Sequence, residues 1–264
     1  MKVVHLTRND FYIVLGAAYK ALNINPKLME VGVLRGQNAI AMHNAIAQST
    51  TPSLTLLIDS WSVEVTKGWN SFEGDTPPWL LPQEAKNEYY GGSVFEQETY
   101  DRLYAECIEN VKALPNVKII RNSSIGALTQ IEQVSGTNKF DLCYIDATHQ
   151  YEYVLRDLMY YQQFVAEDGC LMLNDCCFSP TGARLNFGVL EAVGNFLKRA
   201  PFRPVALTST DFSDLMMVRR GSKLGDLLDE LFVQNAISYV EVPDQLLPAA
   251  KVIQGAKRTN ISFI

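Results

Sequence analysis

The sequence predicts a doubly wound α/β fold built on a mostly parallel sheet. Short runs that are apolar at almost every position recur along the chain, as expected for strands that helices cover on both faces. Segments with a helical spacing of apolar residues alternate with these runs, and such alternation is typical of βαβ units. The five runs lie at 28–31, 54–58, 117–120, 140–145 and 170–173.

Helices are predicted at 38–47, 151–165 and 189–197, each after one of these runs. In the second of them, apolar residues recur every three or four positions, which places them on one face of a helix. Two further strand-like runs, 204–207 and 215–218, are separated by only seven residues. That connection is too short for a helical crossover, so these two strands are predicted to be antiparallel.

Two segments lie outside this alternation. Residues 61–95 contain several turn signals and all three tryptophans, and a long insertion of this kind is predicted to form a lid or binding loop. The alternative is that its aromatic residues pack on the body of the protein or on a second subunit. The C-terminal extension, 221–264, has one amphipathic helix at 224–236. This extension is expected to cap the sheet edge or to mediate formation of a homodimer.

The composition fits a single domain, 1–264, that carries this insertion and this extension. Of the 264 residues, 47% are hydrophobic and 20% are charged, which is enough to bury a full core. The net charge of -6 and the scattered basic residues argue against nucleic acid and against a polybasic membrane contact. No apolar run is long enough to span a membrane, and the first ten residues lack a secretion signal core. We therefore expect a cytoplasmic location and a small molecule as the partner.

A glycine loop follows the first strand. Glu30 lies at the end of the apolar run, and Gly32 and Gly36 follow it four residues apart. A dinucleotide-phosphate fingerprint needs glycine two residues after the first glycine, but Leu34 stands there. An acid at this place suits a ligand with a positive charge, because a carboxylate and an ammonium form a charge-assisted hydrogen bond. The alternative is an ordinary strand-turn-helix in which the glycines only permit a tight turn.

This acid-x-Gly-x-x-x-Gly pattern resembles motif I of the class I S-adenosylmethionine-dependent methyltransferases. The resemblance implies that S-adenosylmethionine is the cofactor and that Glu30, Gly32 and Gly36 wrap its amino-acid end. It also implies a Rossmann-like methyltransferase fold, in which a seven-stranded sheet ends in an antiparallel strand. A nicotinamide-dependent oxidoreductase on a similar sheet remains an alternative, although the incomplete dinucleotide fingerprint argues against it.

Ligands of open parallel sheets bind beyond the carboxyl ends of the strands, so the residues after each strand are candidates for the site. Asp59 and Ser60 follow the second strand, where a carboxylate can accept hydrogen bonds from both ribose hydroxyls. Asn122 and Ser123 follow the third strand and are placed to reach the adenine edge. For both pairs the alternative is helix capping, which these residue types also favour.

The residues after the fourth strand carry the second resemblance. The string Ile145-Asp146-x-x-His149-x-Tyr151-Glu152-x-Val154-x-x-Asp157-Leu158 resembles a stretch shared by small-molecule O-methyltransferases, including those that act on natural-product sugars and relatives of catechol O-methyltransferase. An imidazole that titrates near neutral pH can take the proton of an attacking hydroxyl, so His149 is the predicted base. Asp146 is expected to contribute to catalysis and to cofactor binding. The alternative is that His149 caps the following helix; the catechol-type relatives carry lysine at this position.

The resemblance also implies a possible metal site. Asp146 and Asp175 fall where the metal-dependent relatives have two aspartates, which would hold Mg²⁺ against the substrate oxygens. Those relatives have asparagine after the second aspartate, whereas this chain has Cys176, a soft ligand that suits magnesium poorly. Either Asn174 substitutes for the missing ligand or the protein uses no metal.

Together these residues predict an enzyme that transfers the methyl group of S-adenosylmethionine to a hydroxyl of a small molecule. The rival from another functional class is a non-catalytic cofactor-binding or scaffold protein that keeps the fold. The departure at Cys176 and the long insertion at 61–95 are the features that favour this rival.

Overall fold

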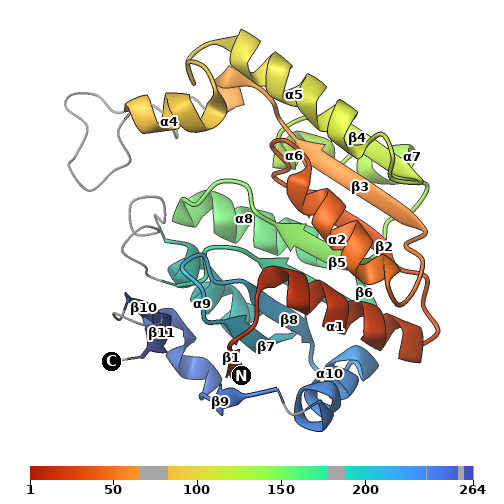
Figure 1. The fold of residues 1–264 in the computed structure, drawn as a ribbon, viewed down its shortest axis with the longest axis vertical. Coiled ribbons are helices and arrows are strands. Elements are labelled where there is room, and N and C mark those ends of the chain that lie inside the picture. Colours follow the sequence, from red (N-terminus) through yellow and green to blue (C-terminus); the bar gives the residue numbers. More distant parts are fainter. Residues whose placement is uncertain (66–82, 178–187, 236, 255–258, 264) are drawn as a thin grey trace.

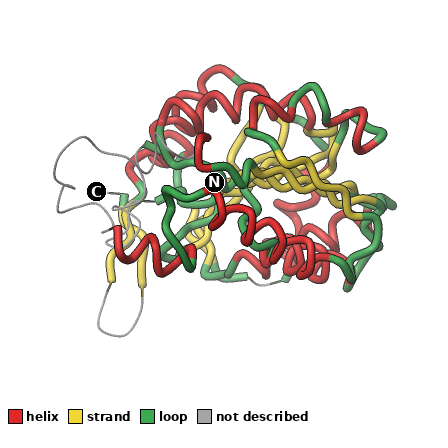
Figure 2. Tube along the Cα trace, turned by 90° about the horizontal axis from the view of Figure 1, so that it is seen from above, coloured by secondary structure: helices red, strands yellow, loops and turns green. Residues whose placement is uncertain are grey.

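A computed structural model describes residues 1–65, 83–177, 188–235, 237–254 and 259–263. A central sheet separates two layers of helices (Figures 1 and 2). The strands of this sheet are β1 (Lys2–Val4), β2 (Lys27–Val31), β3 (Leu54–Asp59), β4 (Val117–Arg121), β5 (Phe140–Ile145), β6 (Val165–Leu173), β7 (Phe202–Thr208), β8 (Leu215–Arg219) and β9 (Tyr239–Glu241).

The order of the nine strands is β4-β3-β2-β5-β6-β8-β7-β1-β9. Strands β2 to β6 are parallel to one another, and β8 is antiparallel to both β6 and β7. This arrangement confirms the predicted doubly wound fold with an antiparallel last strand. The five apolar runs form β2 to β6, and the two runs joined by the short connection form β7 and β8.

The sheet has two more strands than the seven expected from the sequence. Strand β1 pairs in parallel with β7, and β9 pairs antiparallel with β1 at the sheet edge. Each of these strands has three residues, which is too short for a hydrophobic pattern to be recognised. The pairing of β1 brings the chain after it to the same edge of the sheet as the carboxyl end of β7.

Two helical layers cover the sheet. On one face, α1 (Arg8–Ala21), α2 (Gln37–Ala47) and α10 (Lys223–Gln234) pack against β2, β5, β6 and β8, and α5 (Gln97–Val111) packs beside α2. On the other face, α8 (Tyr151–Tyr161) and α9 (Val189–Arg199) pack against the opposite sides of the same strands. The short helices α6 (Ser124–Ala127) and α7 (Ile131–Ser135) lie on this second side. Burial on both faces explains why the strands are apolar throughout.

One predicted helix is too long. The apolar spacing predicts a helix over 151–165, but α8 ends at Tyr161, a single 3₁₀ turn covers Gln162–Phe164, and Val165 begins β6. Val165 is buried because it pairs with Phe140 of β5 and not because it continues the helix. The buried strand residue Val165 therefore falls where the apolar spacing of the helix predicts its next buried position.

The C-terminal extension packs on the body of the protein. After α10, strand β9 forms the sheet edge, the 3₁₀ segment η3 (Asp244–Ala249) packs against α9, and β10 (Lys251–Gln254) pairs with β11 (Thr259–Ser262). Leu247, Ala250 and Val252 join the hydrophobic cluster under α8 and α9. Of the described helices, none has the length and apolar character needed to cross a membrane.

Candidate functional site

A cavity of about 1480 Å³ lies at the carboxyl ends of β2, β3, β5 and β6. This volume exceeds the range of roughly 300–1,000 Å³ usual for a single ligand, so the cavity has room for a cofactor and a second molecule. Most of the residues predicted from the sequence line it: Glu30, Gly32, Asp59, Ser60, Ser123, Asp146, His149, Asn174 and Asp175. Gly36 and Asn122 are adjacent to lining residues but are not part of the wall.

Both glycines of the loop are required by the fold. Gly32 has φ +87°, and a Cβ at this position would lie 2.0 Å from the carbonyl oxygen of Asp146. Gly36 has φ +76°, and its Cβ would lie 2.7 Å from Cγ1 of Val111 in α5. The glycines therefore let the loop pass between the top of β5 and α5. This close approach leaves the backbone of Gly32 and Val33 facing the cavity.

Glu30 is the buried acid at the end of β2. Its side chain is 1% exposed, Oε1 accepts a hydrogen bond from Asn38 Nδ2 at 3.0 Å, and Oε2 has no partner among the described residues. Burial raises the pKa of Glu30 to about 8, against the lowering effect of Asn38. A buried carboxylate oxygen without a partner is costly. Its position in the wall of the cavity therefore indicates that a ligand with a hydrogen-bond donor or a positive charge binds here.

Asp59 holds the glycine loop in place. Its Oδ2 accepts the backbone N–H groups of Val33 at 2.8 Å and Leu34 at 2.9 Å, and Oδ1 accepts the N–H of Trp61 at 3.1 Å. Leu34 has φ +51°, so these bonds stabilise an unfavourable backbone conformation. Sequence reasoning placed Asp59 on the ribose; the structure gives the same carboxylate a second task, the fixing of the loop.

The loop contacts of Asp59, together with the ribose contact predicted from the sequence, lead to a prediction. The Asp59→Ala protein is expected to lose three hydrogen bonds to a charged acceptor, which lowers the free energy of unfolding by about 2–4 kcal/mol and weakens cofactor binding roughly tenfold or more. Denaturant unfolding and calorimetric titration with S-adenosylhomocysteine measure the two effects. Glu98→Ala, which removes an exposed acid of α5, serves as the control. Unchanged stability and unchanged affinity would contradict both tasks.

Asn122 and Ser123 cap a helix in the structure. Ser123 Oγ accepts the N–H of Gly126 at 3.0 Å as the N-cap of α6, and Asn122 Oδ1 accepts the N–H of Ser123 at 2.8 Å. The capping alternative is therefore present. Ser123 nevertheless remains in the cavity wall together with Ser124 and Ile125, so its contact with adenine stays a prediction.

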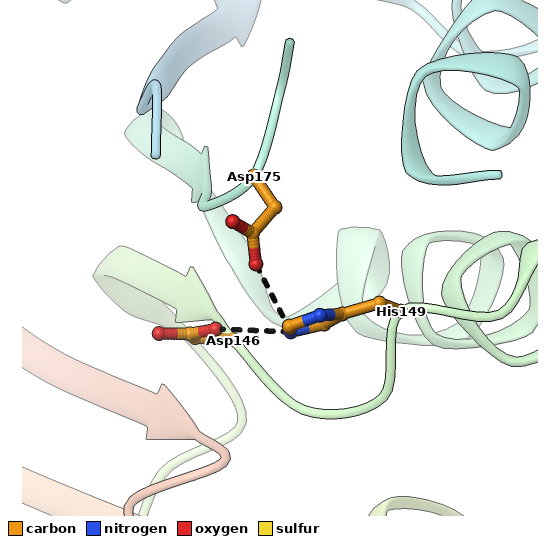
Figure 3. A group of neighbouring side chains, drawn as sticks. All are labelled: Asp146, His149 and Asp175. Carbon is orange, nitrogen blue, oxygen red and sulfur yellow. Dashed lines mark ion pairs between the residues drawn. The ribbon is translucent and has the colours of Figure 1, made fainter. Parts of the chain in front are cut away.

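Asp146, His149 and Asp175 form one cluster at the tops of β5 and β6 (Figure 3). His149 Nε2 lies 3.1 Å from Asp175 Oδ2 and 3.6 Å from Asp146 Oδ1. Asn174 Nδ2 donates a hydrogen bond to Asp146 Oδ2 at 3.4 Å. Asp175 has φ +58°, a strained conformation for a residue with a side chain. The structure brings these residues together because the carboxyl ends of two neighbouring parallel strands, β5 and β6, lie at the same edge of the sheet.

The two carboxyl groups have different pKa shifts. Burial raises the pKa of Asp175 to about 6, even though the nearby His149 opposes this effect. Burial also raises the pKa of Asp146, but the hydrogen bond to His149 and the charge of Arg8 together bring it below its ordinary value. Asp146 is therefore the permanent negative charge beside the imidazole.

The cluster suits magnesium poorly. Atoms of Asp146, His149 and Asp175 lie within 4.8 Å of one another, so the three residues are close enough to hold an ion. Magnesium prefers oxygen ligands, however, and an imidazole nitrogen suits ions such as Zn²⁺ or Fe²⁺ better. The Cys176 thiol is buried and donates weakly to the carbonyl oxygens of Leu173 and Asn174. It does not replace the asparagine of the metal-dependent relatives, and the donor set does not support Mg²⁺.

A network of polar side chains at the cavity was not predicted from the sequence. Arg8 Nε donates to Asp214 Oδ1 at 2.8 Å, and Tyr144 Oη donates to the same oxygen at 2.9 Å. Asn38 Oδ1 accepts hydrogen bonds from Tyr12 Oη at 2.9 Å and from Arg8 at 3.4 Å. These residues come from α1, α2, β5 and the connection before β8. No local motif marks them, because only the fold brings them together.

The described part of the insertion packs on the glycine loop. Trp61 is 1% exposed and its Nε1 donates to Leu34 O at 2.8 Å, so this tryptophan belongs to the body of the protein. Helix α4 (Gln83–Tyr90) ends at the loop, where Arg35 donates to Tyr89 O at 2.8 Å. The side chain of Tyr89 is 62% exposed and lines the cavity. Three other aromatic residues of the predicted lid, Trp69, Phe72 and Trp79, lie outside the described residues.

The fold and this site define a doubly wound α/β protein with a large cavity at the strand ends. A family model described as a methyltransferase domain matches residues 29–176, which is more than half of the chain. The chain belongs to this methyltransferase family. The matched range extends from β2, before the glycine loop, to Cys176 just after Asp175, so it contains the predicted site residues after the strand tops.

Solved structures with a similar fold include three methyltransferases. An O-methyltransferase from Bacillus cereus in complex with SAH is 12% identical, with a TM-score of 0.46 over 82% of this chain and 83% of that one. The O-methyltransferase NovP is 15% identical, with a TM-score of 0.47 over 80% and 79%. A ribosomal protein L11 methylase from Lactobacillus delbrueckii subsp. bulgaricus is 13% identical, with a TM-score of 0.47 over 82% and 81%. Likenesses this distant do not indicate a substrate. No curated protein matches the chain.

Proposed function

We propose that this methyltransferase transfers the methyl group of S-adenosylmethionine to a hydroxyl of a small molecule. The observation that carries the proposal is the placement of His149 Nε2 between two carboxylates, in the same cavity as the glycine loop and Glu30. The cavity thus offers both an acceptor for a cationic cofactor and a base.

In this proposal the cofactor lies along the tops of β2, β3 and β4. Glu30 binds the ammonium of the methionine portion, and the backbone of the loop between Gly32 and Gly36 surrounds it. Asp59 and Ser60 contact the ribose, and Ser123 faces the adenine, while Asn122 lies behind it and binds its N–H group. This order is supported by the cavity, which runs past these strand ends without interruption.

His149 takes the proton of the acceptor hydroxyl as the oxygen attacks the methyl carbon. The new C–O bond forms while the S–C bond breaks, the sulfonium becomes a neutral thioether, and the proton remains on the imidazole. Asp146 stabilises the imidazolium, because its pKa is held below the ordinary value and it stays ionised. Most of the remaining rate enhancement comes from holding the oxygen in line with the methyl group.

The acceptor is proposed to have an apolar or ring-shaped face. Tyr89, Tyr153 and Phe212 line the cavity and remain 62%, 39% and 37% exposed, respectively. Exposed aromatic side chains at a cavity wall are suited to flat, partly apolar ligands. The guanidinium of Arg156 lies over the Tyr153 ring at 4.9 Å from its centroid, which fixes one of these walls.

The function is tested by incubating the protein with S-adenosylmethionine and a panel of phenols, catechols and sugar hydroxyls. Mass spectrometry detects S-adenosylhomocysteine and the methylated acceptor. Formation of both supports the proposal. Binding of S-adenosylhomocysteine in calorimetry without turnover of any acceptor would favour the scaffold alternative, and binding of NADH with a change in its absorbance would favour the oxidoreductase.

Metal dependence is tested separately, since an ion bound to the imidazole would compete with the proton that His149 takes up as a base. We expect the methyl transfer rate to change less than about twofold after treatment with EDTA and gel filtration, because the base then acts without an ion. Activity that disappears on chelation and returns with Mn²⁺, Fe²⁺ or Zn²⁺ would assign His149 to a metal site with Asp146 and Asp175.

A further inference from the structure

Arg8 reaches the cavity through an element that the predicted seven-stranded sheet lacks. Strand β1 pairs in parallel with β7 as far as Val4 and Thr208, so the chain leaves β1 at the carboxyl edge of the sheet. Thr7 then caps α1 in a capping box with Asp10, and Arg8 is the first residue of the helix. The position of Arg8 at the inner end of the cavity is therefore set by the extra strand and by the cap.

Hydrogen bonds hold the guanidinium of Arg8 in one orientation but involve only some of its N–H groups. Its Nε donates to Asp214 at 2.8 Å, one terminal nitrogen donates to Asn38 at 3.4 Å, and the group lies over the ring of Tyr144. A guanidinium has five N–H groups in a planar fork that matches a carboxylate. Within the described part of the chain, the other N–H groups of Arg8 donate no hydrogen bond, and the side chain is 28% exposed in the cavity wall.

Arg8 and Glu30 both form hydrogen bonds with the side-chain amide of Asn38. Asn38 accepts from Arg8 through Oδ1 and donates to Glu30 Oε1 through Nδ2. A positive and a negative group are thus separated by a single amide side chain and two hydrogen bonds. An α-amino acid carries an ammonium and a carboxylate on one carbon, so it fits between two such groups with each charge facing its opposite. Oε2 of Glu30 is buried and has no partner in the described residues, so it is the oxygen that can accept a hydrogen bond from such an ammonium.

We propose that Arg8 binds the α-carboxylate of the cofactor's methionine portion while Glu30 binds its ammonium. This inference rests on the proposed function. The other basic residues of the cavity wall are less suited: Arg35 pairs with Glu106 at 3.0 Å and with Tyr89 O, and Arg156 binds Ser124 and Asp157. Lys86 is 7% exposed. Tyr144 donates to the same oxygen of Asp214 as Arg8 does, so Asp214 is not paired with Arg8 alone.

Three ligands separate the contacts in a calorimetric experiment. S-adenosylhomocysteine carries the ammonium and the carboxylate. Decarboxylated S-adenosylmethionine keeps the ammonium and lacks the carboxylate, although it also carries the methyl sulfonium, and 5′-methylthioadenosine lacks the whole amino-acid end. For Arg8→Gln we expect roughly 10- to 100-fold weaker binding of S-adenosylhomocysteine, the usual range for a charged hydrogen bond. The affinity for the other two ligands is expected to change less than about threefold, since neither has a carboxylate. Arg8→Lys should give an intermediate loss, because an ammonium cannot bind the carboxylate bidentately.

Arg8→Gln also leaves the buried Asp214 without its charged partner, so a second variant controls for misfolding. In Arg8→Gln/Asp214→Asn the buried charge is removed, and the weak binding of S-adenosylhomocysteine should persist. Arg220→Gln makes the same change in net charge at an exposed position beyond the other end of β8 and should bind all three ligands as the wild type does.

Each other outcome overturns the inference. Equal losses for all three ligands, or recovery of binding in the double variant, would make Arg8 a structural partner of Asp214. Unchanged affinity in Arg8→Gln would place the carboxylate elsewhere. A wild-type protein that binds none of the three ligands would refute the proposed function itself, which is a separate result.

Discussion

The His149→Ala protein is expected to lose methyl transfer by about 10²- to 10⁴-fold in kcat, the contribution usual for a general base. Its affinity for S-adenosylhomocysteine is expected to stay within about threefold of the wild type, because the proposal assigns the imidazole, which lies beside Asp146 and Asp175, to the acceptor hydroxyl and not to the cofactor. Single-turnover kinetics measure the chemical step, and calorimetric titration measures cofactor binding.

Two further variants make this experiment specific. His149→Lys keeps a titratable nitrogen between the same carboxylates, and we expect it to recover part of the activity. His5→Ala removes an exposed histidine whose Nδ1 lies 2.8 Å from Ser209 Oγ, and it should behave as the wild type. Equal losses of turnover and of cofactor affinity in His149→Ala would make His149 a structural residue of the cofactor site. Full activity in that variant would assign the proton transfer to another group or to solvent.

The fold is predictable from the sequence where burial is two-sided. Strands β2 to β6 are read directly from runs such as Leu54–Asp59, which helices cover on both faces. The edge strands β1 and β9 follow from no pattern, because three residues at the edge of a sheet do not show a period. The consequence for the site is large, since β1 is the element that carries Arg8 into the cavity.

The candidate site is predictable to the same extent. Glu30, Asp59, Asp146 and Asp175 are found because parallel strands end at one edge and each acid lies within two residues of the end of its strand. What each carboxylate does there depends on neighbours that the sequence does not reveal. Asp59 binds the backbone of Val33 and Leu34, a contact fixed by loop geometry, which the residue type alone does not specify.

Residues from elements without a motif are the ones that sequence reasoning misses. Asp214 precedes β8 in a connection that looks like an ordinary turn, yet it is buried beside Arg8 and Tyr144, and burial raises its pKa to about 7. Tyr12 lies on an apolar helix face and is indistinguishable from a core residue until Asn38 is seen beside it. The roles of Asp214 and Tyr12 follow from tertiary contacts among α1, α2, β5 and the connection before β8.

Glu30→Gln is expected to change stability and cofactor affinity in opposite directions. The pKa of Glu30 is about 8 in the folded protein, mainly because of burial, against an ordinary value of 4.5. Between these two values the folded state binds more protons than the unfolded state, so the free energy of unfolding falls as the pH rises through this window. Glutamine removes that penalty, and we expect a gain of about 1–3 kcal/mol at pH 8 that vanishes below about pH 4.5.

The same substitution removes the partner of the cofactor's ammonium, so the affinity for S-adenosylhomocysteine should fall roughly 10- to 100-fold. In the wild type, an ammonium at Oε2 favours the ionised acid, and binding should release a proton and tighten as the pH rises toward about 8. The charged groups around Glu30 are Arg8, Asp59 and Asp146, and they are unchanged in the variant. Calorimetry in buffers of different ionisation enthalpy measures the proton release, which Glu30→Gln should abolish. A variant that is both less stable at pH 8 and unaltered in affinity would show that the buried oxygen of Glu30 serves the fold and not the ligand.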